Sequence, residues 1–366
     1  MTNNPTMLTY IEQEQAAMIK ILDTYPAQID VVIDNTLLNS SSWLLLGIGS
    51  SYNAALSAKY YIEKTANVLV DLKQPYNYSN YDIVDPNLEV AIGISQSGQS
   101  TSTIDAIKHL AEHNLYTIGV TSQPGKELSQ ACQRTLNILT GREQVGYVSL
   151  GFTATVLNLM LLGLRVGVKK GLISADQEVE ELNQFRDITF HFQDTIDKTK
   201  QFFEENEADF QAASQFTGIA YGPSVGSIKE METKFTETVR IPADGHELEA
   251  FMHGPYLAIN PDHRLFFITT NAQKNVKSKA DSLIKYEQEY TKHLFEINYT
   301  SQPNSSDKVL NLMDIEDESK VPYLGGLPIQ VLAWYITKSR GIDLAKQIFT
   351  DFSEKVHNKT EFQNYV

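Results

Sequence analysis

One turn of the chain is unusually rich in hydroxyl side chains. Six of the nine residues from Ser95 to Thr103 are Ser or Thr, and no Lys or Arg is among them. The turn follows the apolar run 89–94 and precedes a stretch with helical spacing. Ser and Thr are common helix N-caps, which would explain one or two of these residues. A phosphate group could use all of them, because hydroxyls and the free N–H groups of a helix N-terminus bind an anion without lysine.

A second pair of hydroxyls follows another apolar run. Ser50 and Ser51 come directly after the run 43–48, which is predicted to be a strand. Open parallel sheets bind ligands beyond the carboxyl ends of their strands. The two hydroxyl turns are therefore expected at one edge of one sheet, and Gly98 would let the backbone approach the phosphate closely.

The same region partly fits a dinucleotide-binding motif. Gly47 and Gly49 follow the predicted strand, but Tyr52 stands where the third glycine of the motif would be. A nicotinamide-dependent oxidoreductase is an alternative function that depends on this incomplete motif.

The chain alternates short apolar runs with longer amphipathic stretches, which is typical of parallel α/β domains. Five such runs precede a charged, helix-forming stretch at 174–206, and then the pattern restarts. Residues 216–239 repeat the layout of 43–66, and residues 264–285 repeat that of 89–110. An internal repeat of this length predicts two similar domains. The predicted divisions are an N-terminal helical segment (1–35), a phosphate-binding domain (36–172), a helical connector (173–206), a second domain (207–345) and a tail (346–366).

Composition limits the classes of partner. The formal net charge of −15 argues against a nucleic-acid or anionic-membrane surface, because both need clustered Lys and Arg. The apolar segment 153–167 contains Asn158 and Arg165 and is interpreted as a buried helix. One cysteine and no recognisable secretory signal predict a cytoplasmic protein. His246, Glu247 and His253 do not have the spacing of an HExxH motif, so no metal site is predicted.

Three segments together resemble a known family. "GSSYNAA" (49–55), "ISQSGQS" (94–100) and "HELEAFMHGPYLAI" (246–259) are similar to sugar isomerase (SIS) domains, most of all to the isomerase half of glutamine:fructose-6-phosphate amidotransferases. The resemblance implies an α/β fold with two tandem SIS domains, each a doubly wound, mostly parallel sheet flanked by helices. It also implies a sugar-phosphate ligand, no cofactor, and a homodimer whose protomers share their active sites.

The resemblance assigns roles to individual positions. It implies a phosphate-binding loop, a sugar-contacting serine and lysine, a carboxylate base, a histidine that reaches the neighbouring subunit's site to assist ring opening, and a tail lysine that forms an imine. The phosphate-binding loop falls on Ser95, Gln96, Ser97 and Ser100, with Ser51 from the first turn assisting and Ser50 beside it as the other hydroxyl of that turn. The sugar-contacting residues are Ser149 and Lys234, the base is Glu237, the ring-opening histidine is His253, and the tail lysine is Lys359.

The implied chemistry suits these residue types. One carboxylate, Glu237, can move a proton between C1 and C2 of a sugar, and desolvation would raise its pKa toward the working range. Histidine side chains exchange protons near neutral pH, so His253 can carry the ring-opening proton. Lys359 can form an imine with an open ketose. Each residue also has a structural alternative: Glu237 as a solvated residue paired with Lys234, His253 as a turn residue, and Lys359 as a surface lysine.

The sequence departs from the family pattern in two places. Gln99 replaces an acidic residue after "SQSG", and Leu150 and Gly151 stand where a lysine commonly follows the sugar-contacting serine. We still expect phosphate binding, and we expect these changes to alter which sugar is bound.

The leading hypothesis is a phosphosugar enzyme. No glutaminase domain is recognised in the sequence, so amidotransferase activity is not expected. The expected reaction is an isomerase-type proton transfer on a 6-phosphorylated amino sugar or fructosamine with release of ammonia or an amine, as in a deaminase or deglycase. The alternatives are a simple phosphosugar isomerase and a non-catalytic sugar-phosphate sensor.

Overall fold

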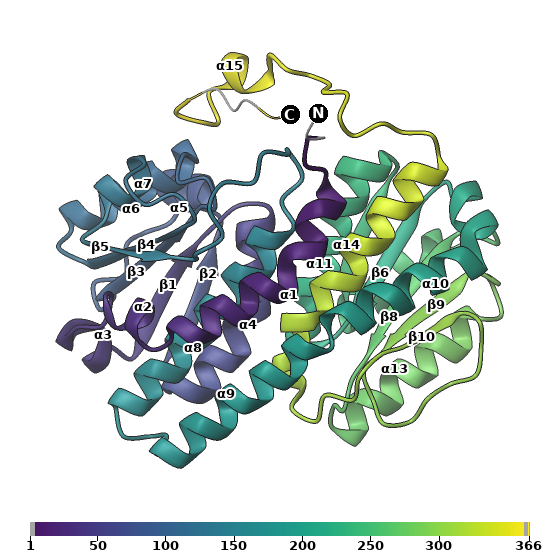
Figure 1. Ribbon diagram of the computed structural model, residues 1–366, viewed down its shortest axis with the longest axis horizontal. Helices are drawn as coiled ribbons and strands as arrows, with labels where there is room; N and C mark the ends of the chain where they lie inside the picture. The colour runs from purple at the N-terminus through teal and green to yellow at the C-terminus, as the bar shows by residue number, and fades with distance from the viewer. Residues whose placement is uncertain (1–3, 362–364, 366) are drawn as a thin grey trace.

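The computed structural model describes residues 4–361 and 365, and it contains two five-stranded parallel sheets (Figure 1). The first sheet has the order β2-β1-β3-β4-β5 and the second β10-β9-β8-β6-β7. Numbered along each half of the chain, both orders are 2-1-3-4-5, the flavodoxin-like variant of the doubly wound fold. The predicted α/β class and the internal repeat are confirmed. The strands are β1 (Ser42–Leu46), β2 (Leu69–Lys73), β3 (Val90–Ile94), β4 (Tyr116–Thr121), β5 (Arg134–Asn137), β6 (Phe216–Ala220), β7 (Ala243–Glu247), β8 (Arg264–Thr269), β9 (Leu294–Asn298) and β10 (Val309–Asn311).

The central strands are covered on both faces. All five residues of β3 and all six of β8 are buried. Continuous apolar runs, without alternation of polar residues, are what a parallel strand between two helical layers requires. This explains why the apolar runs of the sequence predicted strands at the right places.

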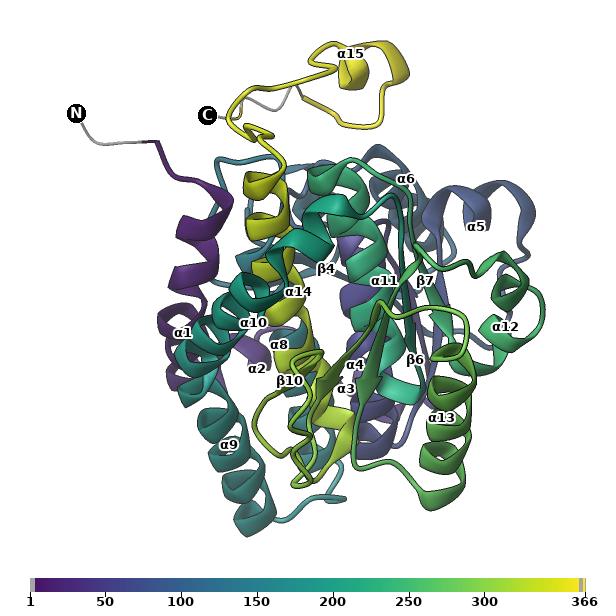
Figure 2. The same cartoon turned by 90° about the vertical axis from the view of Figure 1, so that its right-hand side faces the viewer.

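Four helices lie between the two sheets (Figure 1), and Figure 2 views them from the side of the second sheet. They are α4 (Ser50–Ala66), α8 (Leu150–Lys169), α11 (Val225–Lys234) and α14 (Val321–Ser339). Their apolar residues belong to one core cluster that extends from the first sheet to the second. Gly167 of α8 permits this packing, because a Cβ there would lie 2.2 Å from a backbone oxygen of α4. The two halves are therefore held together by a continuous core.

Helix α8 has the length and composition of a membrane span, but 89% of its apolar window is buried inside the protein. It packs against α4, α1 and α14. The prediction of a buried core helix at 153–167 is confirmed.

The remaining helices cover the outer faces or connect the halves. Helices α5 (Pro75–Tyr81), α6 (Thr101–Glu112) and α7 (Glu127–Ala131) pack on the first sheet, and α12 (Leu248–Met252) and α13 (Lys274–Glu287) on the second. Helix α1 (Met7–Thr24) crosses the junction of the halves, and α2 (Ala27–Asp30) and α3 (Asn35–Asn39) follow it. The predicted connector consists of α9 (Ala175–Phe190) and α10 (Phe192–Ala212), which meet at His191. The exact domain boundaries stay a prediction.

Shorter helical turns complete the path of the chain. They are η1 (Gly222–Ser224), η2 (Phe235–Val239), η3 (Pro255–Ala258) and η4 (Glu318–Lys320). After α14 the tail returns over the first half and includes α15 (Phe352–Val356), as Figure 1 shows at the top of the view.

Candidate active site

The two hydroxyl turns meet where the strand order of the first sheet reverses. Strands β1 and β3 are neighbours, but β1 is followed by β2 on one side and β3 by β4 on the other. Ser50 begins α4 directly after β1, and the turn 95–100 links β3 to α6. Ligands of doubly wound sheets bind at this kind of switch point. The structure thus places both turns at the expected edge.

The turn 95–100 is compact and buried. The exposed fraction is 8% or less for Ser95, Ser97 and Ser100. The Ser95 hydroxyl accepts the Ser100 N–H at 3.4 Å, and the Ser97 hydroxyl accepts the Gln99 N–H at 3.4 Å. Gly98 has a φ of +69°, a conformation that favours glycine. These hydroxyls surround the N-terminus of α6, which is the arrangement that binds a phosphate.

The C-terminal tail lies directly against this turn. The Lys359 ammonium donates a hydrogen bond to the Ser97 hydroxyl at 3.2 Å, and the Lys359 backbone pairs with Ser100. The Thr101 N–H donates to the carbonyl of Asn358 at 3.3 Å. Burial lowers the pKa of Lys359, which increases the fraction of neutral amine available as a nucleophile. The structure therefore brings the predicted tail lysine to the predicted phosphate loop.

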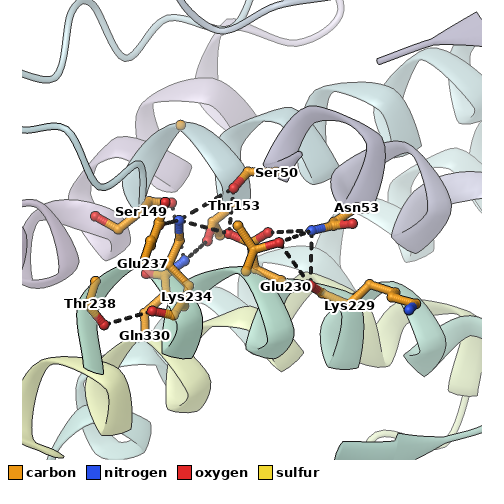
Figure 3. Close-up of polar contacts among 12 residues, drawn as sticks. Ser50, Asn53, Ser149, Thr153, Lys229, Glu230, Lys234, Glu237, Thr238 and Gln330 are labelled. Atoms are coloured by element: carbon orange, nitrogen blue, oxygen red, sulfur yellow. Dashed lines mark hydrogen bonds and ion pairs between the residues drawn. The ribbon is translucent and has the colours of Figure 1, made fainter. Parts of the chain in front are cut away.

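Lys234 joins the second half of the chain to the first (Figure 3). It is 1% exposed, and its ammonium contacts the carboxylates of Glu237 and Glu230, the latter at 3.3 Å. It also donates to the Ser50 hydroxyl at 3.4 Å. Ser50 in turn donates to Glu230 at 2.9 Å. Lys234 is buried between two carboxylates. The alternative in which it forms an exposed ion pair with a solvated Glu237 is therefore wrong for Lys234.

Glu237 lies in the π-helical turn η2, which continues α11. A π-turn inside a helix redirects the side chains after it and is frequent at functional sites. The Glu237 side chain remains 32% exposed, because it lines a cavity of about 970 Å³ that Lys359 also lines. Burial raises the pKa of Glu237, and Lys234 partly offsets this rise. A carboxylate with a raised pKa that faces a cavity can act as a general base.

Ser149 is fully buried at the N-cap of α8. The Glu143 carboxylate accepts its N–H at 3.1 Å and its hydroxyl at 3.3 Å, and it accepts the Gly151 N–H at 2.7 Å. A Cβ on Gly151 would lie 2.7 Å from the Gln96 side chain and 2.9 Å from Glu143. A side chain at position 151 would therefore require Gln96 or Glu143 to move.

Two residues with no distinctive sequence signal complete the cluster. Glu143 holds Ser149, and Glu230 accepts a hydrogen bond from Asn53 of α4 at 2.9 Å (Figure 3). A glutamate in a loop or four positions before a lysine on a helix is too common to be singled out. Only the close packing of α4 against α11 shows that Glu230 lies inside the site.

The other predicted residues lie less centrally. Ser51 is half-buried in the first turn of α4, and the Gln96 carbonyl accepts hydrogen bonds from the Ser122 N–H and hydroxyl. The His253 side chain is 73% exposed at the end of α12, 3.1 Å from Glu249. It does not line the cavity that contains Glu237. Its role at a neighbouring subunit's site, and the homodimer itself, stay predictions.

A protein-family model matches part of the chain. Residues 36–165 match the SIS domain family model. The chain contains an SIS domain. This domain holds both hydroxyl turns and Ser149.

Three relatives extend the similarity beyond the matched SIS domain. The glutamine–fructose-6-phosphate aminotransferase (isomerizing) of Methanosarcina mazei is 23% identical over 86% of this chain and 50% of that protein. The chain thus spans about half the length of the curated relatives it matches. A provisionally named phosphosugar isomerase of Clostridium difficile 630 is 26% identical, with a TM-score of 0.84 over 96% of this chain and 98% of that one. Glucosamine-6-phosphate deaminase of Thermotoga maritima is 19% identical, with a TM-score of 0.76 over 92% and 96% of the two chains. The chain is thus similar to isomerizing aminotransferases in sequence and to these two solved structures in fold.

Proposed function

We propose that this protein is an enzyme that moves a proton between C1 and C2 of a 6-phosphorylated amino sugar or fructosamine and releases ammonia or an amine. One observation carries the proposal: Glu237 faces the same cavity as Lys359, and Lys359 touches the hydroxyl turn 95–100. A phosphate held by that turn would place the rest of an open sugar chain toward the carboxylate. A sensor would need the turn but has no use for a desolvated base beside it.

The proposed reaction balances with one water molecule. Glu237 removes a proton from one of the two carbons and returns it to the other, which converts the C–N single bond into an imine. Water adds to the imine carbon, and the C–N bond then breaks. The nitrogen leaves with its electron pair and a proton as ammonia or an amine, and the sugar keeps a carbonyl oxygen from water. No oxidant or reductant is consumed.

Two lysines have different proposed roles in this reaction. Lys234 is held in its charged form between Glu230 and Glu237, so it positions Glu237 and limits the rise of its pKa. Lys359 has a lowered pKa and is the group proposed to form a transient imine with a ketone at C2. Ser149, anchored by Glu143, would contact a sugar hydroxyl.

Release of nitrogen is favoured over simple isomerisation by two observations. The cavity beside Glu237 has a volume of about 970 Å³, near the top of the range of about 300–1,000 Å³ typical of pockets for drug-sized ligands. An aldose–ketose isomerisation needs no room for a substituent. Among the structural relatives, the Thermotoga maritima protein is a glucosamine-6-phosphate deaminase.

Replacing Glu237 by Gln tests the function. Purified protein should release ammonia or amine from glucosamine 6-phosphate or from fructosamine 6-phosphates. In Glu237→Gln, kcat should fall by about 10²- to 10⁴-fold, the usual contribution of a general base. An assay of ammonia and amine, with sugar-phosphate affinity measured by calorimetry on the same samples, provides the readout.

Glu289→Gln is a matched control, because Glu289 is an exposed glutamate of the second half outside the cavity lining. It should retain full activity. If the protein isomerises the sugar phosphate without releasing nitrogen, it is a simple isomerase and the proposal is wrong. Sugar-phosphate binding without either reaction would establish a sensor.

A further inference from the structure

The cavity beside Glu237 extends away from the phosphate loop. None of the residues 95–100 lines it. Its walls come instead from the start of α1, the loop 145–147, the end of η2, the end of α14 and the tail, which Figure 1 shows together near the two termini. A sugar whose phosphate occupies the turn 95–100 would reach Glu237 at one end of this cavity and leave most of it unfilled.

The walls of this cavity are mostly apolar and aromatic. The apolar and aromatic residues that line it include Met7, Tyr147, Ile241, Trp334, Phe349 and Phe352. Trp334 is partly buried against the core, whereas Phe349 and Phe352 of the tail have exposed fractions of 79% and 55%. Sugars and ammonia offer little apolar surface to such walls. An aromatic or aliphatic group would gain from them, because apolar surface is favourably removed from water.

One cation in the wall has an unused donor. Arg240 ends η2 three residues after Glu237, and its guanidinium donates to the Tyr147 hydroxyl at 3.3 Å. Its Nε atom is buried and has no hydrogen-bond partner in the described part of the chain. A buried donor without a partner is costly, and a guanidinium binds carboxylates with two parallel hydrogen bonds.

The backbone of Arg240 supports a role for its side chain. Its φ is +61° at the end of the helix, a position that glycine usually occupies. A left-handed conformation is unfavourable for a residue with a Cβ, and such outliers cluster at binding sites. Glycine would relieve this cost but would remove the cation from the cavity.

We propose that this cavity binds the amine-side substituent of the substrate and that the substituent is an amino acid with an apolar or aromatic side chain. Arg240 binds its carboxylate, and Trp334 and Phe349 pack against its side chain. The substrate is then a fructosamine 6-phosphate derived from such an amino acid. This inference rests on the proposed function, since it names the amine that Glu237 helps to release.

Three conjugates of fructose 6-phosphate test the inference on the wild-type protein. Their amine components are phenylalanine, phenethylamine and ammonia. Phenethylamine lacks the carboxylate of phenylalanine, and ammonia lacks the aromatic group as well. The expected order of kcat/KM for amine release is phenylalanine, then phenethylamine, then ammonia. Equal rates for phenylalanine and phenethylamine would overturn the role of Arg240. Preference for the ammonia conjugate would overturn the inference and leave the proposed function standing.

Arg240→Gln should reduce the ratio of kcat/KM between the phenylalanine and phenethylamine conjugates by about 10- to 100-fold, because one charged hydrogen-bond partner is lost. Lys346→Gln should leave this ratio unchanged, since Lys346 is an exposed cation of the tail and does not line the cavity. A ratio unchanged in Arg240→Gln would overturn the assignment. The order of kcat/KM among the three conjugates is measured on the wild-type protein, so the inference is tested even if Arg240→Gln does not fold. Failure to release amine from all three conjugates would overturn the inference, and the proposed function would then be tested separately with glucosamine 6-phosphate.

Discussion

The two halves of the molecule share one topology but differ at the corresponding turns of their sheets. The turn after β3 presents the hydroxyls of Ser95 and Ser97 and touches the Lys359 ammonium. At the equivalent place after β8, the Thr270 hydroxyl donates to the Glu318 carboxylate at 3.1 Å, and Asn271 donates to Asp314 at 2.7 Å.

The difference shows what an anion site needs beyond a fold. In the second turn the side-chain donors of Thr270 and Asn271 are bonded to two carboxylates, and these carboxylates would repel a phosphate. In the first turn, the hydroxyls surround the N-terminus of α6 and a cation lies beside them. The second half contributes in another way, because η2 carries Glu237 into the cavity next to the first half.

Introducing a carboxylate into each of the two turns should give the largest difference in sugar-phosphate affinity between the two halves. Ser97→Asp puts a negative charge beside the phosphate, and two charges about 4 Å apart near a protein surface interact by about 4 kcal/mol. We expect sugar-phosphate affinity to fall by about 10³-fold, measured by calorimetry. Gln273→Asp makes the matched change in the second turn, where Gln273 is the exposed N-cap of α13 and Asp is favoured. Equal effects of the two changes would mean that the phosphate does not bind the first turn.

Changing the tail lysine should have a smaller effect on binding and a specific effect on chemistry. Lys359→Arg keeps a cation beside Ser97 but removes the primary amine that forms an imine. We expect turnover to fall while sugar-phosphate affinity stays within about tenfold of wild type, the equivalent of about 1.4 kcal/mol. Borohydride added during turnover should attach the sugar to Lys359 in the wild type, detected by peptide mass spectrometry.

Lys355→Arg is the control for that experiment, because Lys355 is an exposed lysine of the same tail paired with Asp351. It should trap sugar as the wild type does. Trapping that persists in Lys359→Arg would assign the imine to another lysine.

The smallest expected effect concerns the junction of the two halves. Glu14 of α1 is fully buried against α8 and α14, where its polar neighbours are Thr153 and Gln330. Burial raises its pKa well above the ordinary value of 4.5. A carboxyl with a raised pKa stabilises the fold fully below the unfolded-state pKa, and this contribution is lost as the pH rises toward the folded-state pKa.

Glu14→Gln, which stays neutral, should therefore remove part of the decline in the free energy of unfolding between pH 5 and pH 8. The slope attributable to one such group is at most about 1.4 kcal/mol per pH unit. Urea unfolding at several pH values measures it, with the exposed Glu12→Gln as control. Identical pH profiles for wild type and Glu14→Gln would show that Glu14 is charged in the folded protein.

Much of the fold could be predicted from local patterns. Apolar runs such as 43–48 and 89–94 became the buried strands β1 and β3, and the repeat at 216–239 became β6, η1, α11 and η2. The segment 153–167 became the core helix α8 because a parallel sheet needs a helical layer on each face. These features depend on hydrophobic periodicity, which a sequence shows directly.

The candidate site was only partly predictable. The composition of residues 95–103 was enough to predict the hydroxyl turn, whereas Glu143, Glu230 and Arg240 have no distinctive local pattern. Their importance depends on which groups lie next to them in space: Ser149 for Glu143, Lys234 for Glu230, and Tyr147 for Arg240. Such contacts join residues from different parts of the chain and leave no periodic signal.

Local sequence patterns are enough to predict the α/β class, the duplicated topology and the location of the hydroxyl turn, because strand and helix periods and turn chemistry act over a few residues. Which functional groups contact one another depends on long-range packing. Only the folding of the tail over the first sheet brings Lys359 to Ser97, across 262 positions of the chain. Likewise, only the packing of α11 against α4 buries Lys234 between Glu230 and Glu237 beside Ser50. Burial and proximity set the charge and pKa of these groups, and both are properties of the assembled core.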